Sequence, residues 1–212
     1  MTRNTIRDAA GLLACMALVA GLSGCRVHVD KDANGEEKNV QVDTPFGGIH
    51  VNTDQTTAAD LGLPVYPGAQ IVKNDNDKSA DVHMGFGSWE LRVKVVNYSS
   101  ADSQDQVVAF YKKALGRFGD VISCQDGKPV GSPAMTTEGL GCADDDHANV
   151  NVNSDGHSYG YHSNGKGFEL KAGSKRHEHI VGFDSTGPGE TKFALVALDL
   201  PVGSDGSSGK SD

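Results

Sequence analysis

The stretch that decides the fold class is SQDQVVAFYKKALGRF, residues 103–118. Ser103 and Gln106 have the spacing of a capping box, in which each side chain bonds the backbone N–H of the other residue. Gly119 suits the left-handed position that follows a helix. The apolar residues recur at helical spacing on one stripe: Val107, Phe110, Tyr111, Ala114, Leu115 and Phe118. We therefore predict one helix over residues 103–118, with this stripe against a sheet.

Short segments of strand character lie on both sides of this helix. Before it, residues 80–86 and 89–98 form a predicted hairpin around Gly87-Ser88. After it, glycine-rich turns separate predicted strands at residues 120–124, 149–153, 158–162, 168–171, 177–183 and 193–200. One helix among many short strands predicts an α+β fold, with a mostly antiparallel sheet and the helix on one face.

The region before the main domain alternates β-branched and polar residues in three short segments. They read VHVD, VQVD and IHVN, at residues 27–30, 40–43 and 49–52. This period predicts a small antiparallel meander within residues 25–53, which either stands apart or pairs with the main sheet. Residues 53–60 are polar and predict a linker, and the main domain, residues 54–202, is expected to start there. The glycine- and serine-rich residues 203–212 predict a disordered tail.

The start of the chain has the layout of a secretory leader. Arg3 and Arg7 precede an apolar run at residues 12–22, and LSGC follows at residues 22–25. Eleven apolar residues are too few for a membrane-spanning helix, which needs about 20. This layout resembles the signal of bacterial lipoproteins. The resemblance implies removal of residues 1–24 and a diacylglycerol on the sulfur of Cys25, usually with a third acyl chain on its amino group.

That resemblance also implies a cellular location and a first partner, the lipid bilayer. Two or three acyl chains would hold the protein firmly, since each buried methylene contributes about 0.8 kcal/mol. Arg26 follows the cysteine in place of an aspartate, which resembles outer-membrane sorting more than inner-membrane retention. We expect a lipid-anchored protein of the cell envelope, in the outer membrane, facing the periplasm or the cell surface.

A second resemblance covers about residues 63–124. It rests on LPVYPGA at residues 63–69, on the paired strands that follow, and on VVAFYK at residues 107–112. These marks resemble a domain found in many exported bacterial proteins. The resemblance implies a fold and carries no catalytic residue over to this chain.

The charge of the chain limits its partners. The full chain has a net charge of −9, and without residues 1–24 it keeps 17 basic and 27 acidic side chains, a net charge of −10. Nucleic-acid binding depends on lysine and arginine that displace counterions from phosphate, so this class of partner is excluded. Anionic headgroups are excluded as the docking force for the same reason.

The cysteines divide into two groups. The resemblance to bacterial lipoproteins implies that Cys15 leaves with the leader and that Cys25 is acylated, so Cys124 and Cys142 remain. We predict a disulfide between them, because exported proteins fold in an oxidising compartment. The alternative is a redox-active or metal-binding pair, which normally has Cys-x-x-Cys spacing or clustered ligands.

His177 and His179 are the candidate metal ligands. On a strand they point to one face about 6.5 to 7 Å apart, and a neighbouring strand with His157 or His162 would supply a third ligand. The alternative is a solvated strand face beside Lys175 and Arg176.

Three other patterns are weaker. Residues 156–160, GHSYG, match a nucleophile elbow, but no helix follows and the order of acid and histidine is wrong. The acidic turns at residues 75–77 and 144–147 lack the ligand register of an EF-hand. Trp89, the only tryptophan, is predicted to lie in the sheet core, with an exposed binding platform as the alternative.

These patterns predict a function by class only. We expect a membrane-anchored envelope lipoprotein without enzymatic activity or cofactor, which binds or scaffolds an envelope protein or ligand. The alternative is a metal-binding envelope protein or an enzyme that uses His177 and His179.

Overall fold

The computed structural model describes the parts of the chain that form the sheet and its cover. These are residues 24–31, 37–53, 55–72, 79–143, 152–154, 157–159, 167–183 and 189–201. Side chains are described for all of them except residues 37–38, 152–154 and 157–159. The leader before residue 24, the acidic turns at residues 75–77 and 144–147, His162 and the tail at residues 203–212 lie outside this description.

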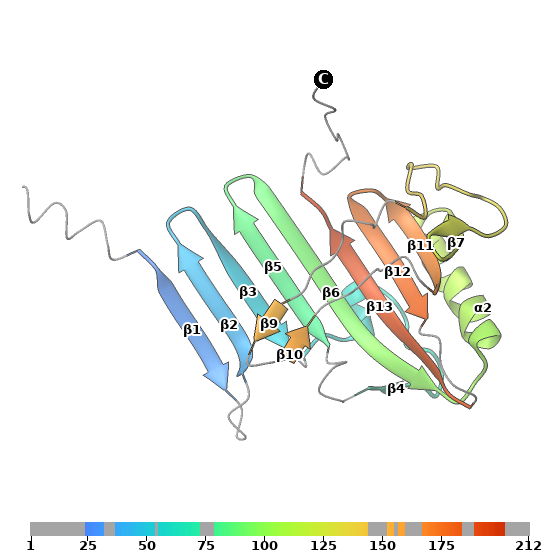
Figure 1. The fold of residues 1–212 in the computed structure, drawn as a ribbon, viewed down its shortest axis with the longest axis horizontal. Coiled ribbons are helices and arrows are strands. Elements are labelled where there is room, and N and C mark those ends of the chain that lie inside the picture. The colour runs from blue at the N-terminus through green and yellow to red at the C-terminus, as the bar shows by residue number, and fades with distance from the viewer. Residues whose placement is uncertain are drawn as a thin grey trace, which may run out of the picture.

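The main element is an antiparallel sheet, which Figure 1 shows face-on. Within the described residues it has eleven strands, in the order β1-β2-β3-β5-β6-β13-β12-β11-β7-β8, with β4 paired to β6. Its strands are β1 (Arg26–Lys31), β2 (Glu37–Thr44), β3 (Gly47–Thr53), β4 (Gln70–Ile71), β5 (Ala80–Phe86), β6 (Trp89–Ser100), β7 (Val121–Gln125), β8 (Lys128–Pro129), β11 (Phe168–Ser174), β12 (His177–Phe183) and β13 (Thr191–Asp199). A separate hairpin consists of β9 (Val152–Ser154) and β10 (His157–Tyr159).

The helix occurs where the sequence predicts it. It is α2 (Gln104–Leu115), which continues as the 3-10 turn η2 (Gly116–Phe118). Ser103 is its N-cap, and the backbone N–H of Ser103 donates to Gln106 Oε1 at 3.1 Å, as a capping box requires. A mostly antiparallel sheet with one α-helix among the described residues confirms the predicted α+β class. Among the described residues, the helices are all too short or too polar to cross a bilayer.

The three N-terminal strands extend the main sheet. Strand β3 pairs with β5 along its whole length, from Gly47 opposite Phe86 to Thr53 opposite Ala80. This pairing makes β1 the exposed edge of one continuous sheet (Figure 1).

The predicted linker at residues 53–60 is wrong as far as the structure describes it. Thr53 still belongs to β3, and residues 58–61 form the 3-10 turn η1 (Ala58–Leu61). Thr57 and Asp60 cap this turn reciprocally, and Ala58 and Leu61 are buried in the core under α2. The capping pair makes the segment look polar, although its two apolar side chains dock against the sheet.

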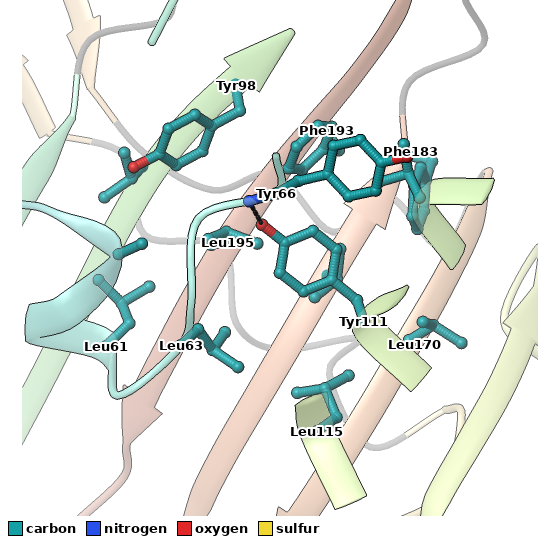
Figure 2. Packing of buried hydrophobic residues seen from close by; sticks show 14 of the residues in the cluster. Leu61, Leu63, Tyr66, Tyr98, Tyr111, Leu115, Leu170, Phe183, Phe193 and Leu195 are labelled. Carbon is teal, nitrogen blue, oxygen red and sulfur yellow. Dashed lines mark hydrogen bonds between the residues drawn. The ribbon is translucent and has the colours of Figure 1, made fainter. Parts of the chain in front are cut away.

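The core under α2 is an aromatic and aliphatic cluster that Figure 2 shows from close by. Tyr111, from the middle of α2, is fully buried in it. Its hydroxyl donates to the Pro64 carbonyl and accepts the Tyr66 N–H, each at 3.2 Å. The Tyr66 hydroxyl in turn donates to Asp102 at 2.6 Å, just before the helix. Residues 63–69 are therefore held by α2 at this point.

We expect Tyr111→Phe to lower the free energy of unfolding by about 1 to 3 kcal/mol, because the buried Tyr66 N–H loses its partner. Urea unfolding followed by circular dichroism measures this. Tyr66→Phe is the matched comparison and should cost about 0.5 to 1 kcal/mol, since Asp102 is exposed and water replaces the lost hydroxyl. Equal losses in the two variants would contradict the role given to Tyr111.

The predicted disulfide is confirmed. Cys124 in β7 is bonded to Cys142, with Cα atoms 5.6 Å apart and a sequence separation of 18. The bridge holds the segment after β8 over one face of the sheet. Beside it, Lys171 Nζ donates to the Cys142 carbonyl at 3.0 Å, and this lysine side chain is fully buried. The bridge therefore also holds the acceptor of a buried charge.

Replacement of both Cys124 and Cys142 by alanine should lower the free energy of unfolding by about 3 kcal/mol, because a loop of this size is no longer closed in the unfolded chain. Chemical denaturation of the oxidised protein and the variant measures the difference. Cys25→Ser is the control and should leave stability unchanged, since Cys25 is exposed and unbridged. A double variant as stable as the parent would show that the bridge has no structural role.

Trp89 differs from its prediction. It is the first residue of β6, is 38% exposed, and lies beside Phe86 with ring centroids 6.1 Å apart. The core position that we predicted is wrong, because the tryptophan lies at the hairpin turn, beyond the part of the strand that the sheet buries.

Candidate functional site

A row of polar side chains crosses seven strands of the sheet. Each member is the cross-strand partner of the next, so neighbouring side chains lie on one face about 5 Å apart. We call these residues the histidine row: His28, Gln41, His50, His83, Arg92, Asp199 and His177.

Strand alternation explains why this face is polar. Each of the first strands places a polar residue between two apolar ones, as in Val-His-Val at residues 27–29 and Ile-His-Val at residues 49–51. Successive side chains of a strand point to opposite faces. The apolar set therefore lies on the other face, where Val51, Val82 and Val93 are buried in a second apolar cluster.

Every imidazole of the row is paired with a carboxylate. Each histidine has its own carboxylate, which lies on the same strand, on an adjacent strand or on the other side of a hairpin turn. The pairs are His28 Nε2 with Asp30 Oδ1 at 3.1 Å, His50 Nε2 with Asp43 Oδ1 at 3.1 Å, His83 Nε2 with Glu90 Oε1 at 3.0 Å, and His177 Nδ1 with Asp199 Oδ1 at 2.8 Å.

The centre of the row is its most connected part. Asp43 accepts from His50 and also from Gln41 Nε2 at 2.7 Å. The hydrogen bond from His50, and next the one from Gln41, lower the pKa of Asp43 below its ordinary value. The rings of His50 and His83 meet edge to face, with centroids 6.1 Å apart.

Arg92 continues the row from this centre. Its Nη2 donates to Asp81 Oδ2 at 3.0 Å and its Nε donates to Asp81 Oδ1 at 3.3 Å, a two-point contact that fixes the guanidinium plane. All of these groups are partly open to water, with the four imidazole side chains 40% to 67% exposed.

This arrangement suits recognition better than covalent chemistry. The imidazoles point to separate carboxylates and do not converge, and no three or more histidine, cysteine or acidic side chains of the described residues are grouped to hold a metal ion. The row instead presents paired donors and acceptors over a broad face.

The structure places His177 and His179 on the same face of β12, as predicted, but gives them different surroundings. His177 is exposed and belongs to the row through Asp199. His179 stacks on Phe118 of η2, with ring centroids 3.6 Å apart and planes 10° apart, and has a backbone hydrogen bond with Leu61. The His177 ring therefore pairs with a carboxylate at the surface, and the His179 ring makes a packing contact. The side chains of His157 and His162, the proposed third ligands, lie outside the description.

Ser158, the centre of the elbow pattern, lies inside β10, which pairs with β9. An elbow nucleophile needs a turn from a strand into a helix. Ser158 occupies a strand in a hairpin instead.

A cleft of about 590 Å³ lies between α2 and the turn after η1. Its lining is mostly apolar, and the one charged side chain is Arg117, whose Nη1 donates to the Gly62 carbonyl at 2.9 Å. Since the lining contains no acid, base or nucleophile, the cleft is a weaker candidate than the row.

Sequence reasoning missed the histidine row, with the exception of His177. A signal was present, because His28, His50, His83 and Arg92 each stand between apolar residues of a short strand. Their alignment, however, depends on which strands are neighbours and in what register.

Comparisons of the chain with protein-family models, with curated proteins and with solved structures found no match.

His179 makes stability depend on pH. Burial lowers the pKa of His179 below its ordinary value of 6.5. As the pH falls below that value, the unfolded chain binds a proton that the folded protein does not, so stability falls with pH. The full contribution is present above pH 6.5 and is lost on acidification.

We expect His179→Phe to lose less stability than the parent between about pH 7.5 and about pH 5, because phenylalanine keeps the ring contact and cannot take up the proton. Urea unfolding at a series of pH values measures the two slopes. His177→Gln is the control for an exposed histidine and should keep the His179 component of the slope. Parallel curves for the parent and His179→Phe would contradict the assignment.

Proposed function

We propose that this protein is a lipid-anchored component of a bacterial cell envelope, in the outer membrane, whose sheet binds another envelope protein or ligand without catalysing a reaction. The histidine row carries the binding part of this proposal. It offers exposed, hydrogen-bonded polar side chains across seven strands, and its imidazoles do not converge on one point.

The anchor part rests on the leader and on Cys25. The LSGC pattern at residues 22–25 supports acylation, and the Cys25 side chain is exposed, as an acceptor for lipid must be. Strand β1 begins at the next residue, so the chain has no spacer between the proposed anchor and the sheet. The sheet would therefore lie close to the bilayer.

The alternative of a metal carrier or enzyme built on His177 and His179 has less support. Asp199 occupies Nδ1 of His177, and Phe118 covers the ring of His179. A metal at this place would have to displace both contacts.

The anchor is tested on protein purified from its own membranes. Intact-mass measurement should show a chain that begins at Cys25 and carries at least a diacylglycerol, and Cys25→Ser should shift the protein from the membrane fraction to the soluble fraction. An unprocessed or unmodified amino terminus would remove the anchor from the proposal.

The binding face is tested by comparing variants of the membrane-purified protein. His50→Gln with His83→Gln should reduce capture of the cross-linked envelope partner by about tenfold, because two charge-assisted contacts at the centre of the row are lost. Lys112→Gln with Lys113→Gln, on the exposed side of α2, is the matched control and should capture as the parent does. Equal capture by both variants, or turnover of a substrate by the purified protein, would overturn the proposed role.

A further inference from the structure

Exposed apolar side chains gather at one corner of the sheet. Five of the nine large apolar residues that are exposed within the described chain lie in two neighbouring hairpin turns or on the edge strand β1 next to them. We call them the apolar corner: Val27 (62% exposed), Val29 (38%), Phe46 (83%), Phe86 (45%) and Trp89 (38%). The other four, Val65, Ile71, Val130 and Met135, belong to other parts of the fold.

Two hairpin turns build this corner. Thr44 pairs with Gly47 at the turn between β2 and β3, and Phe86 pairs with Trp89 at the turn between β5 and β6. Gly47 is also the partner of Phe86, so the two turns are neighbours at one end of the sheet, as Figure 1 shows. A side chain at position 47 would overlap the Gly85 carbonyl and the Phe86 ring, and glycine permits this close approach.

The proposed acylation site is part of the same corner. Arg26 of β1 is the cross-strand partner of Asp43 in β2, so Cys25 lies at the end of the sheet where β2 turns into β3. Pro45 and Phe46 form that turn. Acyl chains on Cys25 would therefore start at the same end of the sheet as the exposed Phe46 ring.

We infer that the apolar corner inserts into the boundary between headgroups and acyl chains of a neutral, zwitterionic bilayer, and that this contact orients the sheet on the membrane. The inference rests on the proposed anchor at Cys25, which would hold the corner at the membrane at high effective concentration. Tryptophan and phenylalanine at hairpin tips are suited to this boundary, because large apolar rings leave water there. The net negative charge of the chain argues against attraction to anionic lipid.

The contact would leave the histidine row open. Strand alternation puts Val27 and Val29 on the face opposite His28, and Trp89 on the face opposite Arg92. Insertion of the corner therefore covers the turn end of the sheet and leaves the row facing water, where a partner can reach it.

Trp89 is the only tryptophan of the chain, so its fluorescence reports on the corner directly. Protein purified from its membranes is reconstituted into phosphatidylcholine vesicles, with or without bromine near the headgroup end of the acyl chains. Brominated lipid should quench the fluorescence of Trp89. Iodide in the water should quench it less when the protein is on vesicles than when the protein is in solution without lipid. Unquenched Trp89 in a preparation whose mass shows acylated Cys25 would overturn the docking and leave the anchor intact.

Variants test whether docking needs the apolar corner itself or only exposed apolar residues anywhere on the protein. Phe46→Ser with Phe86→Ser should lower the ratio of docked to undocked protein by about tenfold, because two exposed rings no longer leave water on docking. Phe46→Ser alone tests the same loss of docking at a side chain that is 83% exposed, so the substitution should leave the fold intact. Val130→Ser with Met135→Ser is the matched control and should dock as the parent does. Equal docking of the corner and control variants would overturn the inference.

Two further outcomes are decisive. Quenching of Trp89 in protein whose mass shows no acyl chain would support the docking surface while removing the anchor at Cys25. A second copy of the chain is the other candidate occupant of the corner. Protection of Trp89 from iodide that rises with protein concentration in the absence of lipid, together with a dimer in sedimentation, would assign the corner to that copy and overturn the membrane assignment.

Discussion

The pairing of β3 with β5 is the contact on which the other features of this protein depend. It joins the three N-terminal strands to the sheet that α2 covers, in a register that sets Gly47 beside Phe86 and His50 beside His83. The first of these pairs brings two hairpin turns together at one corner, and the second continues the histidine row from β3 into β5. A register shifted by one residue would exchange the two faces of β1 to β3. The same backbone hydrogen bonds therefore position both candidate surfaces.

The sheet uses its two faces differently along its width. On the side of α2, aromatic and aliphatic side chains form the core around Tyr111, while the same face carries the exposed histidine row over β1, β2 and β3. The opposite face is mostly apolar, with Val93 and Val196 buried and Val27 exposed at the edge, and it also buries Lys171 and Glu178. One helix cannot cover a sheet of this width, so part of one face must be polar. The row supplies that polarity through hydrogen bonds between imidazoles and carboxylates and through the Arg92–Asp81 ion pair, contacts that are individually weak on an exposed surface.

Local patterns predicted the local elements well. The capping pair at Ser103 and the 3.6-residue spacing after it were sufficient for α2, and the run at residues 177–183 became β12 with the same bounds. The predicted linker failed because capping residues and short apolar residues in η1 resemble a polar loop when read in isolation. Trp89 failed because an alternating strand pattern does not show how far the sheet extends over each strand.

By itself the sequence determined the fold class, the helix, most strands, the disulfide pair and the expectation of a lipid anchor, because periodicity, capping residues and cysteine usage act within short stretches or by elimination. Tertiary structure alone decided that β1 to β3 join the main sheet, that the row lines up across seven strands, and that the turns with Phe46, Phe86 and Trp89 lie at the same end of the sheet. The physical reason is that a strand pattern specifies which face each side chain takes but not which strand lies next to it. Neighbours and register are set by backbone hydrogen bonds between segments far apart in the chain.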